Sequence, residues 1–494
     1  MRPHVAIVGG GIGGLAALEH LTRVAPWLQV TLLESGQRLG GHVRTERSGA
    51  FLMEAGPDVI VASKPAAAEL ARRVGLGDRL CGTKPGVHGA YILSGTRLVR
   101  MPEGITGLVP SRFAPFATTR LVSPLGKIRV AAEYFIPPRR DRTDESIEGF
   151  VTRRLGREMY QRLVEPLLSG ISAGDGSRLS MEAMFPQLRS YEIEYGGLVK
   201  GMLAIKRKRR LAARADAAGA AAPLAGFLSL PNGLSELVDG VQREVRKREP
   251  SGKRVTIRIG ARVERVERVT AGADDAGGYA IVLVGGERIG VDGVILATPA
   301  YVASGFLRAL DDSLASRLAE IEYASTVTVS VAYPEAAVPR PLDATGYLVP
   351  RIYGRPVLAC TWVSSKFEGR SPTGHALFRL FLGGAGRGSW AGSSDDELLV
   401  VVRHELRDVM GITIEPELVH INRFDRAMPQ YHVGHLDRVA HIEALTARHT
   451  GLALAGAAYR GVGIPDCVTS GERAAGAVLA ALAAQYPSDS GSWE

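Results

Sequence analysis

Short apolar runs on either side of a helical apolar stripe open the chain. Val5–Val8 is wholly apolar and Val30–Leu33 is largely so, while Leu15, Leu18 and Leu21 between them recur at helical spacing. A continuous apolar run is typical of a strand buried in a parallel sheet. The pattern therefore predicts a strand, a helix and a second parallel strand.

Similar patterns return later. An apolar run between Gly451 and Gly456 predicts a short buried strand, and the stripe of Ala474, Val478 and Leu482 predicts a final amphipathic helix. The other elements expected here are a helix over Ser235–Val245 and strands over Val255–Ile259, Arg262–Val269, Tyr279–Val284 and Val291–Leu296.

The middle of the chain changes character twice. Residues 86–205 are helix-rich, most clearly over Arg142–Leu168, whereas Thr326–Ala332 and Leu377–Leu382 alternate as strands do. At 494 residues the chain exceeds what one core usually supports. We predict an α/β and α+β protein with a discontinuous Rossmann-type domain (1–80, 227–300 and 441–486), a helical subdomain (86–205), a basic Ala-rich linker (206–226) and a sheet-bearing substrate domain (301–440).

A glycine loop lies between the first strand and the first helix. Gly9, Gly11 and Gly14 match GxGxxG, where they allow a tight turn, close approach of a pyrophosphate, and packing of helix on strand. The helix N-terminus would then present free N–H groups to the phosphates. Glu34 ends the second strand, where an acid can bind the ribose hydroxyls. Together these features predict a dinucleotide site.

Composition and charge exclude several classes of protein. Three well-separated cysteines argue against a disulfide framework or a zinc site. Neither a signal peptide nor a spanning segment is evident, so we expect a cytoplasmic protein with at most peripheral membrane contact. The net charge of +9 suggests an anionic partner, but the basic run Lys206–Arg210 lacks interleaved aromatic residues and nucleic acid is not expected.

Two further segments bear on the choice between NAD and FAD. Arg38–Thr45 resembles the RxGGxxxT segment of glutathione-reductase-like and amine-oxidase-like flavoproteins, and Glu54–Asp58 forms a Gly-Pro turn that in such proteins lies beside the flavin ring. A returning turn at Gly461–Asp466 would aim the last helix at the flavin and favour its negative charge on reduction. These segments predict FAD.

Longer segments narrow the resemblance. Leu163–Asp175, Met428–His435 and Gly461–Cys467 resemble the oxygen-dependent porphyrinogen oxidases of haem synthesis, in particular the Gram-positive-type coproporphyrinogen III oxidase, also called protoporphyrinogen oxidase, of the amine-oxidase-like flavoproteins. The resemblance implies oxidation of coproporphyrinogen III, and of protoporphyrinogen IX as a second candidate. FAD would take the electrons, O2 would reoxidise it with release of H2O2, and a ferrochelatase would receive the product.

The resemblance also implies particular cofactor contacts. His42 stands where relatives usually have Lys or Arg, which puts a cationic phosphate contact in doubt, and Lys64 is a candidate for positioning the substrate. The implied contacts are Gly9, Gly10, Gly11, Ile12, Gly13, Gly14, Glu34, Ser35, Gly41, His42, Gly56, Pro57, Asp58, Val59, Val263, Val462, Gly463 and Ile464.

Several alternatives remain open from the sequence. An amine or carotenoid oxidoreductase shares the fold, although only Tyr459 is available for an amine-binding aromatic cage in the C-terminal segment. A non-catalytic flavin- or porphyrin-binding carrier is the other alternative. His432 and His435 form HxxH without an acidic ligand, which favours structural histidines over a metal site. No spacing identifies a catalytic acid or base.

Overall fold

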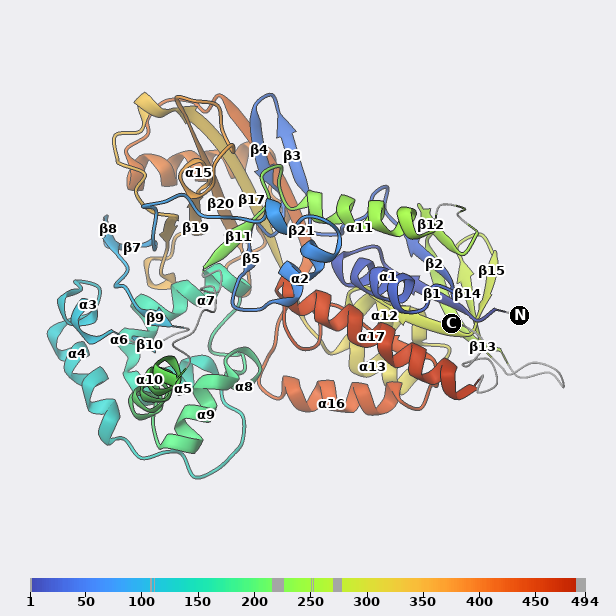
Figure 1. Cartoon of the computed structure of the whole chain (residues 1–494). Helices are drawn as coiled ribbons and strands as arrows, with labels where there is room; N and C mark the ends of the chain where they lie inside the picture. The colour runs from blue at the N-terminus through green and yellow to red at the C-terminus, as the bar shows by residue number, and fades with distance from the viewer. Residues whose placement is uncertain are drawn as a thin grey trace.

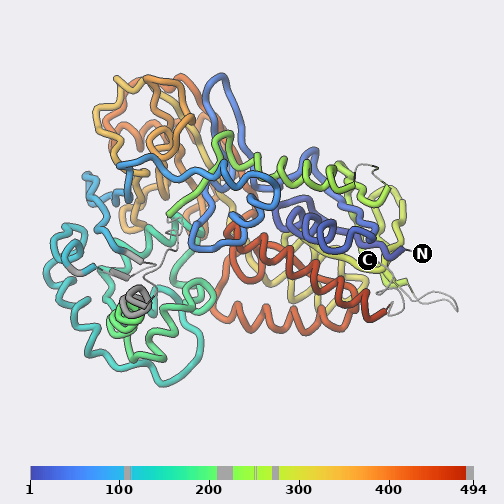
Figure 2. The backbone as a smooth tube through the Cα atoms, viewed as in Figure 1, coloured from blue at the N-terminus to red at the C-terminus, as the bar shows by residue number. Residues whose placement is uncertain are grey.

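The computed structural model describes residues 2–106, 109–110, 112–215, 226–249, 251, 253–269 and 278–485. Figure 1 shows a layered α/β region that contains the N-terminus, a second sheet beside it, and a group of helices below that sheet. The trace in Figure 2 shows that the α/β region is built from blue, green and red segments, which lie far apart in the sequence. The predicted fold class is confirmed.

The α/β region is centred on a parallel sheet in the order β12-β2-β1-β16-β22. The two N-terminal strands pair in register, with Val5 opposite Val30 and Val8 opposite Leu33. The side chains of these strands are buried on both faces, which explains their continuous apolar pattern. The strands are β1 (His4–Val8), β2 (Gln29–Glu34), β12 (Val255–Ile259), β16 (Gly293–Leu296) and β22 (Leu452–Leu454).

Helices cover both faces of this sheet. On one face, α1 (Ile12–Val24) packs against α11 (Ser235–Arg248) and α17 (Ile464–Gln485) (Figure 1). On the other face lie an antiparallel ribbon and three more helices, whose side chains form a second apolar cluster. These elements are β13 (Val263–Val269), β14 (Gly278–Leu283), β15 (Arg288–Val291), α12 (Ala300–Leu307), α13 (Asp312–Ala319) and α16 (His435–Thr446). The sequence did not predict β15.

The second region is a seven-stranded sheet in the order β21-β17-β20-β19-β18-β7-β8. Its last two strands correct the predicted boundary, because residues 86–205 were expected to be helical. Since β18 pairs with β7, these strands extend the substrate-domain sheet. The elements are β7 (Tyr91–Ser94), β8 (Arg97–Arg100), β17 (Tyr323–Pro334), β18 (Gly346–Leu348), β19 (Val357–Trp362), α14 (Val363–Lys366), β20 (His375–Gly383), α15 (Asp395–Met410) and β21 (Leu418–Pro429).

The stretch Arg142–Leu168, predicted to be the most clearly helical part of this subdomain, consists of several short helices. The first helix begins only after Ser146, whose hydroxyl accepts a hydrogen bond from the N–H of Gly149 at 3.1 Å. It ends at Gly156, whose φ of +96° is incompatible with a continuing α-helix. The helices are α3 (Phe113–Thr118), α4 (Pro124–Ala131), α5 (Ile147–Leu155), α6 (Arg157–Met159), the π-turn η3 (Tyr160–Val164), α7 (Glu165–Ser172), α8 (Met181–Met184), α9 (Pro186–Tyr195) and α10 (Leu198–Ala215).

The basic linker predicted over residues 206–226 is wrong in its first half. Helix α10 continues to Ala215, because alanine, lysine and arginine are strong helix formers. Residues 216–225 lie outside the described residues, and the chain resumes at β11 (Phe227–Ser229), which pairs with β5 (Ile60–Val61) and β6 (Cys81–Gly82). No helix among the described residues is long and apolar enough to span a bilayer.

The remaining elements are short. They are the hairpin strands β3 (Thr45–Ser48) and β4 (Phe51–Glu54), helix α2 (Ala66–Arg73), strands β9 (Ile105–Thr106) and β10 (Val109–Pro110), and the 3-10 turns η1 (Gly77–Arg79), η2 (Ala132–Phe135), η4 (Glu335–Ala337), η5 (Arg351–Tyr353) and η6 (Trp390–Gly392).

Candidate functional site

The glycine loop between β1 and α1 has room on one side only. A β-carbon added to Gly9, whose φ is +107°, would lie 2.6 Å from the carbonyl oxygen of Ala297, and one added to Gly14 would collide with the carbonyl oxygen of Gly9. A β-carbon on Gly11 would meet nothing within 4 Å. Gly11 is also the N-cap of α1 and supplies no side-chain hydrogen bond to it. The loop is therefore open beside Gly11, at the N-terminus of α1, where the first N–H groups of a helix have no partner within the helix.

Glu34 holds this loop from the end of β2. One carboxylate oxygen accepts a hydrogen bond from the N–H of Gly10 at 2.7 Å, and the other accepts from Gly36 at 2.6 Å. Each oxygen keeps a second lone-pair direction for a ligand. Ser35 beside it is exposed, and Val263 begins β13 two residues after Ala261, whose N–H donates to the carbonyl of Glu34.

The Gly40–Gly41 segment lies against the glycine loop. The N–H of Gly40 donates to the carbonyl of Gly10 at 2.8 Å, and a β-carbon on Gly41 would lie 3.1 Å from the Cα of Gly11. His42 packs edge-on against Phe424, with ring centroids 5.6 Å apart. Burial, and secondarily the charge of Arg38, lower the pKa of His42. A lowered pKa makes His42 a poorer cation for a phosphate contact than a lysine or an arginine would be.

The Gly-Pro turn of Gly56, Pro57, Asp58 and Val59 follows this segment in space. A β-carbon on Gly56 would collide with the carbonyl oxygen of His42, which places the turn directly on the Gly40–Gly41 segment. The substrate-domain sheet holds the turn from the other side. The hydroxyl of Thr328 in β17 donates to the carbonyl of Ala55 at 3.2 Å.

Sequence reasoning missed three buried cations that reach this turn. Lys366 lies 2.6 Å from the Asp58 carboxylate, and Arg379 donates to the carbonyls of Ala55, at 2.7 Å, and Gly56. Arg370 donates to the Ser229 hydroxyl at 2.8 Å and to a neighbouring carbonyl. Arginine inside an apolar strand was a usable signal, because a charge in a buried strand needs a specific partner.

The returning C-terminal turn carries Val462, Gly463 and Ile464 into the first turn of α17. Asp466 in that turn accepts a hydrogen bond from the N–H of Gly463 at 3.2 Å. The ammonium of Lys64 lies 2.8 Å from both oxygens of the same carboxylate. A β-carbon on Gly13 would lie 3.4 Å from the carbonyl of Cys467, so the turn reaches the glycine loop.

The HxxH pair has structural contacts. His435 is fully buried, stacks on Tyr431 with centroids 3.9 Å apart, and its Nε2 lies 2.8 Å from the carbonyl of Tyr459. Burial lowers the pKa of His435 to about 4. Tyr431 in turn accepts a hydrogen bond from the N–H of Gly461 at 2.8 Å. Across the described part of the chain, no three His, Cys, Asp or Glu side chains gather as metal ligands.

The Leu163–Asp175 segment joins the helical subdomain to the large sheet. Glu165 is buried and accepts hydrogen bonds from the Ser169 hydroxyl at 2.6 Å and from Arg387 at 2.9 Å. Ala173 ends α7 with a φ of +48°, and its carbonyl accepts from the N–H of Ala385 at 2.7 Å. This segment therefore connects the helical subdomain to the loop after β20 through buried polar contacts.

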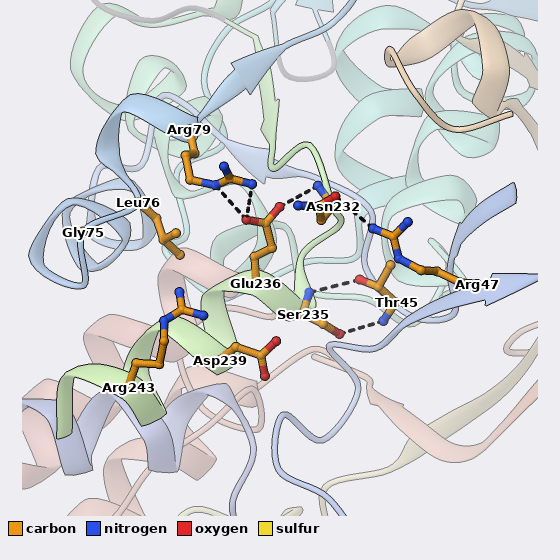
Figure 3. Close-up of a pocket in the computed structure, with 10 residues that line it drawn as sticks. All are labelled: Thr45, Arg47, Gly75, Leu76, Arg79, Asn232, Ser235, Glu236, Asp239 and Arg243. Carbon is orange, nitrogen blue, oxygen red and sulfur yellow. Dashed lines mark hydrogen bonds and ion pairs between the residues drawn. The ribbon is translucent and has the colours of Figure 1, made fainter. Parts of the chain in front are cut away.

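A polar pocket of about 660 Å³ lies beside β3 and the start of α11 (Figure 3). Two of its arginines have neighbouring partners: Arg79 pairs with Glu236 at 2.8 Å, and Arg47 donates to the side-chain oxygen of Asn232 at 2.9 Å. The lining residues are Thr45, Arg47, Gly75, Leu76, Arg79, Asn232, Ser235, Glu236, Asp239 and Arg243. None of the predicted cofactor contacts is among them, although Thr45 also ends the Arg38–Thr45 segment and its hydroxyl donates to Glu54 at 2.8 Å.

Comparisons with known proteins agree with this geometry. The flavin containing amine oxidoreductase model matches residues 12–479. The chain is 32% identical over 489 residues to coproporphyrinogen III oxidase of Bacillus subtilis (97% of this chain, 99% of the relative), and 30% identical over 481 residues to chloroplastic protoporphyrinogen oxidase 1 of Arabidopsis thaliana (94% and 85%).

A solved structure extends the match to three dimensions. A presumed protoporphyrinogen oxidase from Exiguobacterium sp. 255-15 superposes with a TM-score of 0.81 at 31% identity, over 99% of both chains. The resemblance read from the middle segments is thereby confirmed. This chain belongs to the flavin containing amine oxidoreductase family.

Proposed function

We propose that this chain oxidises a porphyrinogen to the corresponding porphyrin in haem biosynthesis, with FAD as cofactor and O2 as electron acceptor. Coproporphyrinogen III is the proposed substrate, ahead of protoporphyrinogen IX. One observation carries the proposal: relatives in Bacillus subtilis and Staphylococcus aureus, both named coproporphyrinogen III oxidase, are 32% identical over nearly the whole of both chains.

The described residues fit FAD. Open space in front of Gly11 and Gly456, where added β-carbons would meet nothing within 4 Å, leaves room for a dinucleotide along the C-terminal edge of the sheet. The residues proposed to contact FAD are Gly9, Gly10, Gly11, Ile12, Gly13, Gly14, Glu34, Ser35, Gly41, His42, Gly56, Pro57, Asp58, Val59, Val263, Val462, Gly463 and Ile464.

Bound flavin would supply the redox chemistry, accepting a hydride in each of three cycles and passing two electrons each time to O2, which gives H2O2. The protein's part is binding and orientation. The N–H groups at the start of α1 would face the pyrophosphate, and Glu34 would accept from the ribose hydroxyls. The N-terminus of α17 would favour negative charge on the ring.

Lys64 remains the candidate for positioning the substrate. Its side chain is 55% exposed and its ammonium is paired with Asp466 at the C-terminal turn. A lysine at this place can exchange a hydrogen bond to Asp466 for one to a substrate carboxylate. In Lys64→Met we expect a higher KM with kcat nearly unchanged, whereas the matched surface variant Lys247→Met should behave as wild type. An unchanged KM in Lys64→Met contradicts this role.

An anaerobic assay tests the activity. Mixed without oxygen, the yellow protein and coproporphyrinogen III should lose the flavin absorbance. When air is admitted, porphyrin fluorescence should appear, and one H2O2 should form for each O2 consumed. Parallel reactions with protoporphyrinogen IX rank the two substrates. Unchanged flavin absorbance with both substrates would sink the proposed activity and favour a carrier.

The same anaerobic assay also tests the alternative activities, and a second measurement tests the proposed partner. Bleaching by an amine or a carotenoid precursor, without bleaching by porphyrinogens, would instead identify the oxidoreductase alternative on the same fold. We also predict that the product is transferred to a ferrochelatase. The protein is predicted to lie in the cytoplasm, with at most peripheral membrane contact. Faster porphyrin release in the presence of ferrochelatase would support the transfer.

A further inference from the structure

Five charged side chains gather at the Gly-Pro turn, and we call them the turn cluster: Glu54, Asp58, Lys366, Arg370 and Arg379. The first two come from the N-terminal segment, and the three cations come from the substrate domain. Arg370 and Arg379 are 2% and 3% exposed, and Glu54 and Lys366 are also buried. The substrate domain thus delivers buried positive charge to a turn of the nucleotide-binding domain.

The contacts within the cluster do not neutralise it. Lys366 and Asp58 form one close pair at 2.6 Å, whereas the nearest carboxylate oxygen to Arg370 belongs to Glu54, at 3.7 Å. Arg379 uses one nitrogen for the carbonyls of Ala55 and Gly56. Its Nε and Nη1, and Nη1 of Arg370, are buried without a hydrogen-bond partner in the described structure.

The charges therefore leave an excess of positive charge. Three cations, Lys366, Arg370 and Arg379, face only two carboxylates, those of Glu54 and Asp58. A buried and uncompensated charge costs free energy unless an opposite charge lies near it. The Asp58 and Glu54 carboxylates attract the Arg379 guanidinium, but among the described residues neither forms a hydrogen bond or a close ion pair with it.

The position of the turn cluster indicates which anion could compensate its positive charge. Arg379 donates to the carbonyl of Gly56, Gly56 packs on His42, and the neighbouring Gly41 packs on Gly11 in the glycine loop. The cluster is thus one backbone layer from the loop that faces the cofactor. The buried nitrogens of Arg379 are closed to solvent, so the cluster acts through its electrostatic field and not by contact with a dissolved ion.

We propose that the turn cluster stabilises the negative charge that the flavin ring carries when it is reduced, and so raises the reduction potential of the bound cofactor. The inference rests on FAD binding as proposed above and is independent of which substrate is oxidised. Lys366 and Arg379 are positioning residues in this account, because they act through the field at the Gly-Pro turn.

The proposal is tested by measuring the dissociation constants of oxidised and of chemically reduced FAD. The ratio of the two constants gives the shift in the reduction potential of FAD on binding, even where binding is weak. Removing one positive charge should weaken binding of reduced FAD more than binding of oxidised FAD, by on the order of tenfold. We expect this change in Lys366→Met and Arg379→Met. Arg379→Lys should keep the wild-type ratio, and so should the surface control Lys247→Met.

A double variant separates charge from structure. Asp58→Asn combined with Lys366→Met removes one charge of each sign, so the ratio should return toward wild type even though a second group is lost. The inference is overturned if the ratio of the Kd for oxidised FAD to the Kd for reduced FAD is unchanged in both Met variants. It is also overturned if this ratio is lower in the double variant than in Lys366→Met. Porphyrinogen is not needed, so failure here is distinguishable from failure of the proposed activity.

Discussion

At the scale of single residues, the Glu34 carboxylate both supports the glycine loop and is proposed to bind the cofactor. Its two oxygens accept hydrogen bonds from Gly10 and Gly36. We propose that the same carboxylate also accepts from the ribose hydroxyls. Hydrogen bonds to a charged acceptor are worth more than neutral ones. The glycine loop therefore depends on Glu34 before any cofactor binds.

Replacing Glu34 by Gln should weaken FAD binding by roughly 1.5–3 kcal/mol, which is about ten- to a hundredfold in Kd. The amide turns one acceptor into a donor that faces a backbone N–H, so the loop loses its support as well. Fluorescence titration of the apoprotein with FAD measures the change. Glu287→Gln, which alters an exposed ion pair between Glu287, just before β15, and Arg258 on β12, is the control. Equal Kd values for the two variants would contradict the role of Glu34.

His435 predicts an acid sensitivity. Its pKa is about 4 in the folded protein, against 6.5 as the ordinary value. As the pH falls, the unfolded chain takes up the proton first, so stability is present above about pH 6.5 and is lost toward pH 4. We expect His435 to account for about 2 kcal/mol of lost stability between pH 7.5 and 5.

Urea midpoints of His435→Phe at the two pH values check this prediction. The phenyl ring can still stack on Tyr431 but does not titrate, so the variant should lose less stability on acidification than wild type. His441→Gln, on the exposed side of the same helix, should retain the wild-type pH dependence. Parallel pH profiles for His435→Phe and wild type would show that another group is responsible.

At the scale of elements, the site depends on how closely α17 approaches α1. A β-carbon on Gly471 would collide with the carbonyl oxygen of Gly13, whereas one on Gly476 would meet nothing within 4 Å. The collision is with backbone, which cannot rotate away as a side chain can. Contact between α17 and α1 therefore requires glycine at one position and tolerates a side chain at the other.

Gly471→Ala should destabilise the protein by about 1–3 kcal/mol or more and weaken FAD binding, because it pushes the C-terminal turn away from the glycine loop. Gly476→Ala, on the same helix, should be neutral or stabilising by up to about 1 kcal/mol, since alanine is the better helix former. Thermal melting and FAD content measure both effects. Similar stabilities for the two variants would contradict the close packing of these helices.

At the scale of the whole molecule, the candidate site exists only when distant segments assemble. Gly11 and Glu34 come from the N-terminal segment, Arg379 from the substrate domain and Gly463 from the last segment. Lys64 and Asp466, which are 402 positions apart, form an ion pair across this assembly. A ligand that binds only the assembled form stabilises all of these regions together.

FAD should therefore raise the unfolding temperature of the whole chain in a concentration-dependent way. At a free FAD concentration of one hundred times Kd, the expected gain is about 2.7 kcal/mol. Melting curves of the apoprotein over a range of FAD concentrations measure it, with AMP as a control that fills only part of the site. A melting temperature independent of FAD would contradict assembly of the site on folding.

Much of the fold could be predicted because its patterns are local. The strand Val255–Ile259 begins and ends as predicted, and the helix begun at Ser235 extends only three residues further. The break between two helices at Gly156 was not predicted, because a single backbone conformation decides it. Strands β7 and β8 were missed because a short edge hairpin has too few residues to show a period.

The sequence by itself determined the nucleotide-binding unit, since Gly9, Gly11, Gly14 and Glu34 act over short, regular spacings. It also determined the family, through segments long enough to resemble known relatives. Only the tertiary structure decided that Lys366 and Arg379 meet Asp58 at the Gly-Pro turn, with Arg370 beside Glu54. Charges separated by some three hundred residues become neighbours through sheet packing, and no local pattern records such a contact.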